Sequence, residues 1–235
     1  PEGLAEIGDQ AFWGCSSLRT LALPEGLTGL GDEAFYGCSS LQALTLPEGL
    51  TSLGNSAFYG CSSLQTLTLP EGITSLGYSA FSGCSRLETV TLPGTLREFG
   101  SAFSDCGALK EVIVSEGITE IDSSAFFGCS SLERAVLPES LEQIGSGAFY
   151  GCGSLTEISL PDGVRSIGDR AFAENGALSR IELPSSVEEI GNEAFSDCTA
   201  LSSIVIPAGT QEIGYQAFSG CTALVSAELP EGVRL

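Results

Sequence analysis

Apolar and polar positions repeat along this chain with a period of about 23 residues, and the dipeptide Ala-Phe marks each repeat. Ten copies occur, and successive phenylalanines are 23 residues apart except for one interval of 22. They are Phe12, Phe35, Phe58, Phe81, Phe103, Phe126, Phe149, Phe172, Phe195 and Phe218. Such a period is typical of a solenoid, in which each repeat forms one coil and the coils stack. We therefore predict an α/β repeat solenoid of about ten coils that occupies residues 1–235 as a single domain.

The first part of each coil has the pattern of a short strand. In the coil that starts at residue 64, Leu67 and Leu69 alternate with threonines, which indicates a strand with one buried face. Pro70 ends this strand because it has no N–H to donate to a sheet. The Pro-Glu-Gly segment predicts a turn, after which Ile73 and Leu76 return to the core. Strands stacked in this way form a parallel sheet, which we expect on the concave side.

The second part of each coil predicts a glycine conformation and a helical turn. The position of Gly77 is glycine in nine of ten coils and Asp122 in the other, so we expect positive φ there. The next residue is often Asp, Asn or Ser, which are the residues preferred at helix N-caps. We therefore expect a short helical turn through Ala-Phe in each coil, on the convex side of the solenoid.

The repeat resembles a known family. Its motif is Leu-x-x-Leu-x-Leu-Pro-x-x-Leu-x-x-Leu-Gly-x-x-Ala-Phe-x-x-Cys, which is present from Leu41 to Cys61 and, with Ile73 at one Leu position, from Leu64 to Cys84. This motif is similar to that of the BspA-like (Treponema-type) leucine-rich repeats. The resemblance implies a leucine-rich repeat solenoid with 22–23 residues in each coil. It also implies a surface or secreted protein of the adhesion type, and it supplies no catalytic residue.

The repeat departs from its own pattern at several places, including Ser115 where the motif has Pro. The fifth coil is one residue short between Gly100 and Ala102, so we expect a kink or altered twist near residues 94–115. Asn175 replaces the cysteine of the motif in the eighth coil. The first and last residues match the interior of a repeat and have no polar cap, so we interpret the chain as a fragment that lacks both caps.

Charge and composition narrow the range of partners. The formal net charge is −21, with nine basic residues against 30 acidic ones. Such a surface repels nucleic acid and anionic lipid, which bind mainly through Lys and Arg, and it favours basic partners. No apolar run approaches the ~18 residues that a membrane-spanning helix needs, so we expect no direct membrane insertion.

Nothing in the sequence indicates catalysis, and we predict neither an enzyme nor a cofactor. The chain has no histidine for acid–base chemistry. Nine cysteines share one position of the repeat, without the close pairs that metal sites use. We interpret them as buried reduced thiols, with disulfides and a metal site as alternatives. They are Cys15, Cys38, Cys61, Cys84, Cys106, Cys129, Cys152, Cys198 and Cys221.

Two groups of residues are candidate contacts for a protein or glycan partner. Trp13, Tyr36 and Tyr59 follow the Ala-Phe pair in three successive coils, and Trp and Tyr are common at binding hot spots. Ile113 and Val136 form an apolar patch at outward-facing strand positions. The alternatives are that the aromatic residues only cover the turns and that the patch has no partner. Beside the patch, Glu111, Arg134, Glu157 and Arg180 alternate in sign, which predicts ion pairs between neighbouring strands.

We thus predict a non-catalytic recognition module at the cell surface or in the extracellular space. A row of acidic side chains after the strand-ending prolines, such as Glu25, Glu48 and Glu71, is interpreted as a solvated rim, although such carboxylates could also bind Ca²⁺. The alternative function is a structural scaffold or docking subunit of a larger assembly, including one associated with a membrane.

Overall fold

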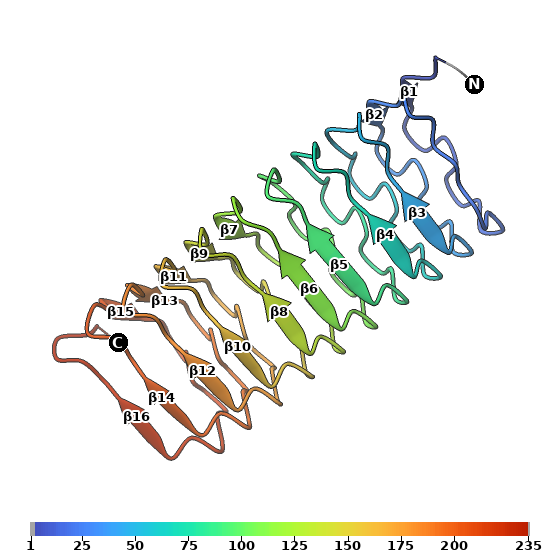
Figure 1. Ribbon diagram of the computed structural model, residues 1–235. Coiled ribbons are helices and arrows are strands. Elements are labelled where there is room, and N and C mark those ends of the chain that lie inside the picture. Colours follow the sequence, from blue (N-terminus) through green and yellow to red (C-terminus); the bar gives the residue numbers. More distant parts are fainter. Residues whose placement is uncertain (1–2, 235) are drawn as a thin grey trace.

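Nearly every coil contributes one short strand to a parallel row that follows the long axis of the molecule (Figure 1). A computed structural model describes residues 3–234. Paired strands lie in register one repeat apart, so that Leu44 faces Leu67. We call this the first strand row. It contains β3 (Ala43–Thr45), β4 (Thr66–Thr68), β5 (Thr89–Leu92), β6 (Glu111–Val114), β8 (Arg134–Val136), β10 (Glu157–Ser159), β12 (Arg180–Glu182), β14 (Ser203–Val205) and β16 (Ser226–Glu228).

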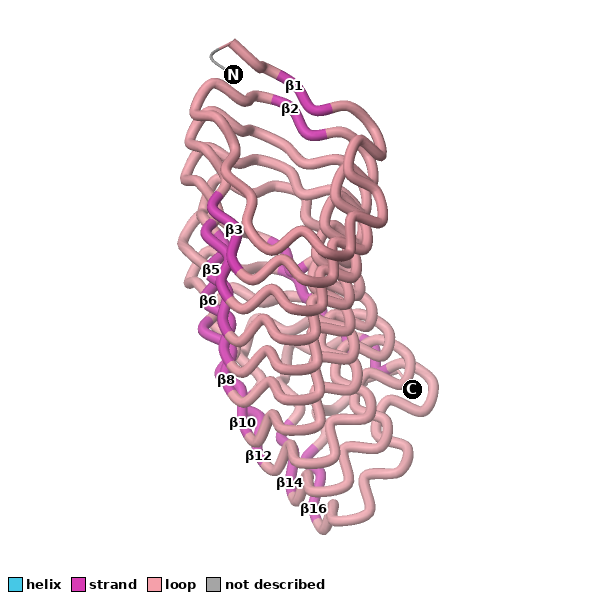
Figure 2. Tube along the Cα trace, turned by 90° about the vertical axis from the view of Figure 1, so that its right-hand side faces the viewer, coloured by secondary structure: helices cyan, strands magenta, loops and turns pink. Residues whose placement is uncertain are grey.

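A second strand row, which the sequence pattern did not predict as strands, lies on another side of each coil (Figure 2). Its strands are only two residues long, and five of them form one parallel sheet in the order β15-β13-β11-β9-β7. Ile73 and Leu76 return to the core as predicted, since both are buried. The row contains β1 (Glu6–Ile7), β2 (Gly29–Leu30), β7 (Glu120–Ile121), β9 (Gln143–Ile144), β11 (Ser166–Ile167), β13 (Glu189–Ile190) and β15 (Glu212–Ile213).

The prediction of short helical turns through Ala-Phe is wrong: residues 3–234 contain turns there and no helix. Each turn segment has two positions with positive φ, such as Glu33 (φ 54°) and Gly37 (φ 68°). A right-handed helix requires negative φ, so these positions prevent one from forming. Instead, the Phe35 N–H donates to the carbonyl of Ala57 in the next coil, at 2.8 Å.

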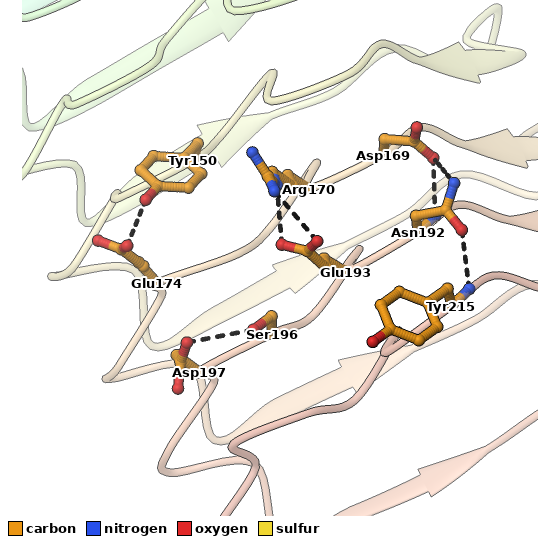
Figure 3. Close-up of polar contacts among 9 residues, drawn as sticks. All are labelled: Tyr150, Asp169, Arg170, Glu174, Asn192, Glu193, Ser196, Asp197 and Tyr215. Carbon is orange, nitrogen blue, oxygen red and sulfur yellow. Dashed lines mark hydrogen bonds and ion pairs between the residues drawn. The ribbon is translucent and has the colours of Figure 1, made fainter.

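The residues predicted as helix N-caps bind the neighbouring coil instead. The Asp32 carboxylate accepts the backbone N–H of Asn55 at 2.6 Å, and the Asn55 side-chain oxygen accepts the N–H of Tyr78 at 2.9 Å. Asp169 and Asn192 repeat this arrangement in later coils (Figure 3). These short polar side chains are therefore present because they satisfy N–H groups between coils.

The phenylalanines of the Ala-Phe pairs form a continuous ladder through the core. Neighbouring rings have centroids 4.9–6.0 Å apart and are inclined by at most 19°. Phe35 and most later members are fully buried, whereas Phe12 in the first coil is 40% exposed. Burying an aromatic ring of this size is a large contribution to folding, so the ladder explains why this dipeptide marks every coil.

The glycine position of the repeat is explained by close packing, and the prediction of positive φ is wrong for it. Apart from Gly100, no member has positive φ. A Cβ atom on Gly54 would lie 2.4 Å from the carbonyl carbon of Gly31, a contact that real Cβ atoms do not make. At Gly54, neighbouring coils thus approach too closely for any side chain.

The short fifth coil leaves the first strand row intact and interrupts the second. Strands β5 and β6 pair in register from Thr89 and Glu111 onward. In the second row, Ser75 bridges to Glu98, and the five-stranded sheet then begins at β7. The Asp122 carboxylate accepts the N–H groups of Phe99 and Gly100, both at 2.6 Å. Asp122 replaces glycine here because its carboxylate satisfies two N–H groups of the shortened coil.

Candidate binding surfaces

The structure brings Trp13, Tyr36 and Tyr59 together as one stack on the turn side of the first three coils. Ring centroids are 5.8 Å apart between Trp13 and Tyr36 and 4.8 Å apart between Tyr36 and Tyr59. The rings are inclined by 13° and 9°, so they are close to parallel. Trp13 is 56% exposed, and Tyr36 is half-buried between its neighbours. We call these three residues the aromatic stripe.

Stacking determines which parts of the aromatic stripe a partner can reach. Each ring face inside the stack is covered by the next ring, which leaves ring edges, tyrosine hydroxyls and the two end faces, on Trp13 and Tyr59, that no other ring covers. The edges of aromatic rings carry partial positive charge and the hydroxyls form hydrogen bonds. A sugar ring that packs flat on an aromatic face would find such a face only at the two ends of the stack.

A second aromatic pair occupies the same position of the repeat further along the chain. Phe127 and Tyr150 have ring centroids 4.6 Å apart and are inclined by 4°. Figure 3 shows that the Tyr150 hydroxyl points to the Glu174 carboxylate. This hydrogen bond raises the pKa of Tyr150, with smaller contributions from burial and from the negative charge of Glu174. Between the two aromatic groups, buried Ser82 and Ser104 share a hydrogen bond of 2.9 Å.

Ile113 and Val136 are direct neighbours on strands β6 and β8 of the first row. Ile113 is 37% exposed and Val136 is half-buried. The adjacent ion pair between Arg134 and Glu111, at 3.2 Å, was predicted from the alternating charges. Val136 and Arg134 also line an open cleft of about 950 Å³. The structure thus places a small apolar patch beside exposed charges.

One predicted ion pair forms differently. Arg180 pairs with Glu182 on its own strand, although Glu157 also lies close enough to raise the pKa of Arg180 slightly. The larger cause of this rise is the hydrogen bond with Glu182. Residues i and i+2 of a strand lie on the same face of the sheet. Glu182 can therefore pair with Arg180 without a contact to the neighbouring strand.

The cysteine position provides a buried hydrogen-bond ladder, as the interpretation of reduced thiols requires. All nine cysteines are free, and seven are buried. The Cys61 thiol donates to the carbonyl of Phe35 in the preceding coil, at 3.5 Å, and other members repeat this bond. Burial raises the pKa of Cys61 and Cys198 to about 12. These thiols therefore serve as packed, weakly polar links between coils.

Asn175 replaces a thiol in this ladder and strengthens the same link. Its side-chain amide donates to the carbonyls of Phe149 and Phe172, both at 2.9 Å. The Asn175 side-chain oxygen is buried and has no partner among residues 3–234. The position thus tolerates any small side chain that can donate to the phenylalanine carbonyls.

Acidic side chains cover much of the remaining surface. The six ion pairs found among residues 3–234 join side chains that are 29–76% exposed, and a surface pair of this kind contributes about 0–1 kcal/mol. No group of three or more potential metal ligands occurs in the described part of the chain. Within the same residues, no helix has the length and apolar character needed to cross a membrane.

Sequence reasoning missed one concave feature, a cleft beside Phe127 and Tyr150. Gly147 is one of the residues that line it, at a turn position where other coils carry larger residues such as Glu33 and Arg170. Alignment of the ten repeats would have revealed this glycine as an exception. Recognition that it opens a cleft requires the positions of its neighbours, which only the structure provides.

Comparisons with known proteins agree with this architecture. A family model described as BspA type Leucine rich repeat region (6 copies) matches residues 5–133 and 119–234. No curated protein matches the chain. A leucine-rich repeat protein from Bacteroides ovatus has a similar solved structure, with a TM-score of 0.77 and 32% sequence identity over 100% of this chain.

Two further solved structures carry more descriptive names. A leucine rich cell surface protein from Faecalibacterium prausnitzii is 30% identical over 97% of this chain, with a TM-score of 0.62. The pneumococcal vaccine antigen PcpA is 26% identical over 97% of it, with a TM-score of 0.63. The chain spans 66%, 70% and 66% of the three proteins, respectively. From the family match and the shared solenoid, we conclude that this chain belongs to the BspA-type leucine-rich repeat family.

Proposed function

We propose that this chain is a non-catalytic recognition module of a surface-exposed protein, and that its partner is a protein. The observation that carries this proposal is the aromatic stripe, in which three rings stack on neighbouring coils and remain partly exposed. Tryptophan and tyrosine contribute large contact areas at little cost in conformational entropy, and they are enriched at binding hot spots.

Location at the cell surface is supported by two similar proteins. One is named as a cell surface protein and another as a vaccine antigen. Adhesion to a host or to another microbe is a natural use of such a module. The net charge of −21 favours a basic partner because it accelerates encounters with positively charged surfaces.

A triple substitution tests the aromatic stripe. Purified chain with Trp13→Ala, Tyr36→Ala and Tyr59→Ala would be compared with wild type for chemical cross-linking to cell-surface proteins, followed by mass spectrometry. Loss of three hot-spot side chains should weaken binding at least ~100-fold. The matched control is Tyr78→Ala with Tyr215→Ala, which removes two exposed rings elsewhere on the turn side.

The results separate the proposed functions. Cross-links at the stripe that the triple variant alone loses would support recognition through this surface. Equal capture of one partner by all three proteins would refute the role of the stripe. A second variant with Ile113→Ser and Val136→Ser would then test the patch on the first strand row. Capture of a whole multi-subunit complex, unchanged by either set of substitutions, would favour the alternative function of a scaffold in a larger assembly.

A further inference from the structure

The cleft at Gly147 is an opening of about 490 Å³ on the turn side of the later coils. Its lining includes the stacked pair of Phe127 and Tyr150, which we call the aromatic wall, and the charged residues Asp169, Arg170 and Glu193, which we call the charged wall. Figure 3 shows Tyr150, Arg170 and Glu193 on successive coils of this surface. The cleft thus combines aromatic and charged side chains.

The cleft exists because Gly147 has no side chain. Its φ is 62°, and the equivalent residues Ser124 and Arg170 have φ of 58° and 55° and carry side chains. A Cβ on Gly147 would lie 3.5 Å from the Ser124 hydroxyl oxygen and 3.9 Å from Phe127 Cδ2, which are ordinary contacts. Positive φ favours glycine here, but packing leaves room for a side chain, and Ser124 and Arg170 carry one at a similar φ. The structural effect of Gly147 is to leave the space above it open.

The charged wall has an excess of negative charge. Arg170 is neutralised by Glu193, which accepts from Arg170 Nε at 2.8 Å and from Nη2 at 3.0 Å. Asp169 uses its Oδ1 atom to accept the backbone N–H of Asn192 at 2.7 Å. Its other carboxylate oxygen has no hydrogen bond among the described residues, and the side chain is exposed. One carboxylate oxygen is therefore available to a ligand next to an aromatic wall.

We propose that this cleft accepts an arginine side chain from a protein partner. A guanidinium group is planar and packs well against aromatic rings, and its N–H groups donate strong hydrogen bonds to carboxylates. It is also less strongly hydrated than a lysine ammonium group, which makes its transfer into a cleft easier. Asp169 and the net negative charge of the chain supply the electrostatic attraction. The proposal specifies the partner chemistry of the recognition function and rests on it, but it concerns a separate surface.

The test uses three short peptides, acetyl-Gly-X-Gly-amide, in which X is arginine, lysine or citrulline. Citrulline has nearly the shape of arginine without its charge. Each peptide would be titrated into the full chain labelled with ¹⁵N, and amide shifts of Gly147 and Tyr150 would give the affinity. We expect the arginine peptide to bind at least several-fold more tightly than the lysine peptide, and the citrulline peptide to cause no shift.

Gly147→Gln is the decisive variant, because Gln10 and Gln216 occupy the same turn position at φ of 56° and 55°. The glutamine side chain fills the cleft without changing the charge, and it should weaken binding of the arginine peptide at least ~10-fold. Ser56→Gln is the matched control, since Ser56 has φ of 53° at the same position in a distant coil. This control should bind the peptide as wild type does.

Three results would overturn the proposal. They are equal binding of the arginine and citrulline peptides, unchanged affinity in Gly147→Gln, and shifts at residues away from the cleft. Thermal unfolding of each variant confirms that it is folded. Asp169→Asn keeps the oxygen that binds Asn192 and should still reduce arginine affinity several-fold. A negative outcome here leaves the test of the aromatic stripe unaffected, because that stripe lies in the first three coils.

Discussion

At the scale of single residues, each coil restricts what the next coil can carry. Gly54 lies so close to Gly31 that even a methyl group would overlap the backbone. The cysteines are also determined by the preceding coil, since every thiol from Cys38 onward donates to a phenylalanine carbonyl one coil earlier. A residue of this repeat is therefore explained by the neighbouring coil more than by its own.

Gly54→Ala should lower the free energy of unfolding by about 1–3 kcal/mol, because the added Cβ forces a backbone shift. Denaturant unfolding followed by circular dichroism measures this change. Gly153→Ala is the control, since a Cβ there would meet no atom within 4 Å. The control should stay within about 0.5 kcal/mol of wild type. Equal losses in both variants would contradict the packing explanation.

The buried thiols should make stability depend on pH in the alkaline range. Burial raises the pKa of Cys61 and Cys198 from the ordinary value of 9.0 to about 12. The native state therefore holds these protons more tightly than the unfolded chain does. Their contribution to the free energy of unfolding is complete below pH 9 and is lost as the pH rises toward 12. Denaturation midpoints should fall across this range, and more gently in a Cys61→Ala, Cys198→Ala variant. Identical slopes would show that other groups cause the fall.

At the scale of elements, the structure depends on short strands and turns that few residues define. Strand β7 is two residues long, and its coil is joined to the shortened fifth coil by the carboxylate of Asp122. That one side chain replaces the missing backbone contacts of the second strand row. The link between these two coils in the second strand row therefore depends on this one side chain.

Asp122→Ala should destabilise the chain by about 2–4 kcal/mol, because it leaves the N–H groups of Phe99 and Gly100 without an acceptor. Asp122→Asn retains an oxygen acceptor and should cost less. Hydrogen exchange of the Phe99 and Gly100 amides measures the effect locally. Exchange rates that do not change in the alanine variant would refute this role for the carboxylate.

The periodicity of the sequence predicted the coil, its core and the strands of the first row, because these depend on many copies of the same pattern. It did not predict strands such as β9, because two residues are too few to show alternation. It predicted a helix where Asp32 and similar residues occur, since an N-cap residue and an inter-coil acceptor look identical in sequence. The repeat period alone places Trp13 beside Tyr36, but only coordinates show that their faces cover one another.

At the scale of the whole molecule, negative charge is spread over an extended surface. The net charge is −21, and few carboxylates are neutralised by the exposed ion pairs. Self-repulsion of this kind lowers the stability of a folded chain at low ionic strength. The same charge keeps individual molecules apart in solution.

Added salt should therefore stabilise the protein. The Debye length falls to about 10 Å at 0.1 M salt, which screens repulsion between rows of carboxylates. The melting temperature should rise by a few degrees between about 0.01 M and about 0.2 M NaCl. Potassium chloride at equal ionic strength should give the same rise, which separates screening from binding of a particular cation. A melting temperature that falls or stays constant would contradict the repulsion.

The bonds between coils, such as those from Phe35 to Ala57 and from Phe126 to Ala148, join residues one repeat apart. Every interior coil therefore presents the same set of donors, acceptors and ring faces to whichever coil follows it. Recombination that inserts or removes a whole coil of the gene restores each of these matches, whereas loss of one codon, as in the fifth coil, needs a compensating residue such as Asp122. The array can thus gain or lose whole coils, and the solenoid can become longer or shorter, without a new fold having to evolve.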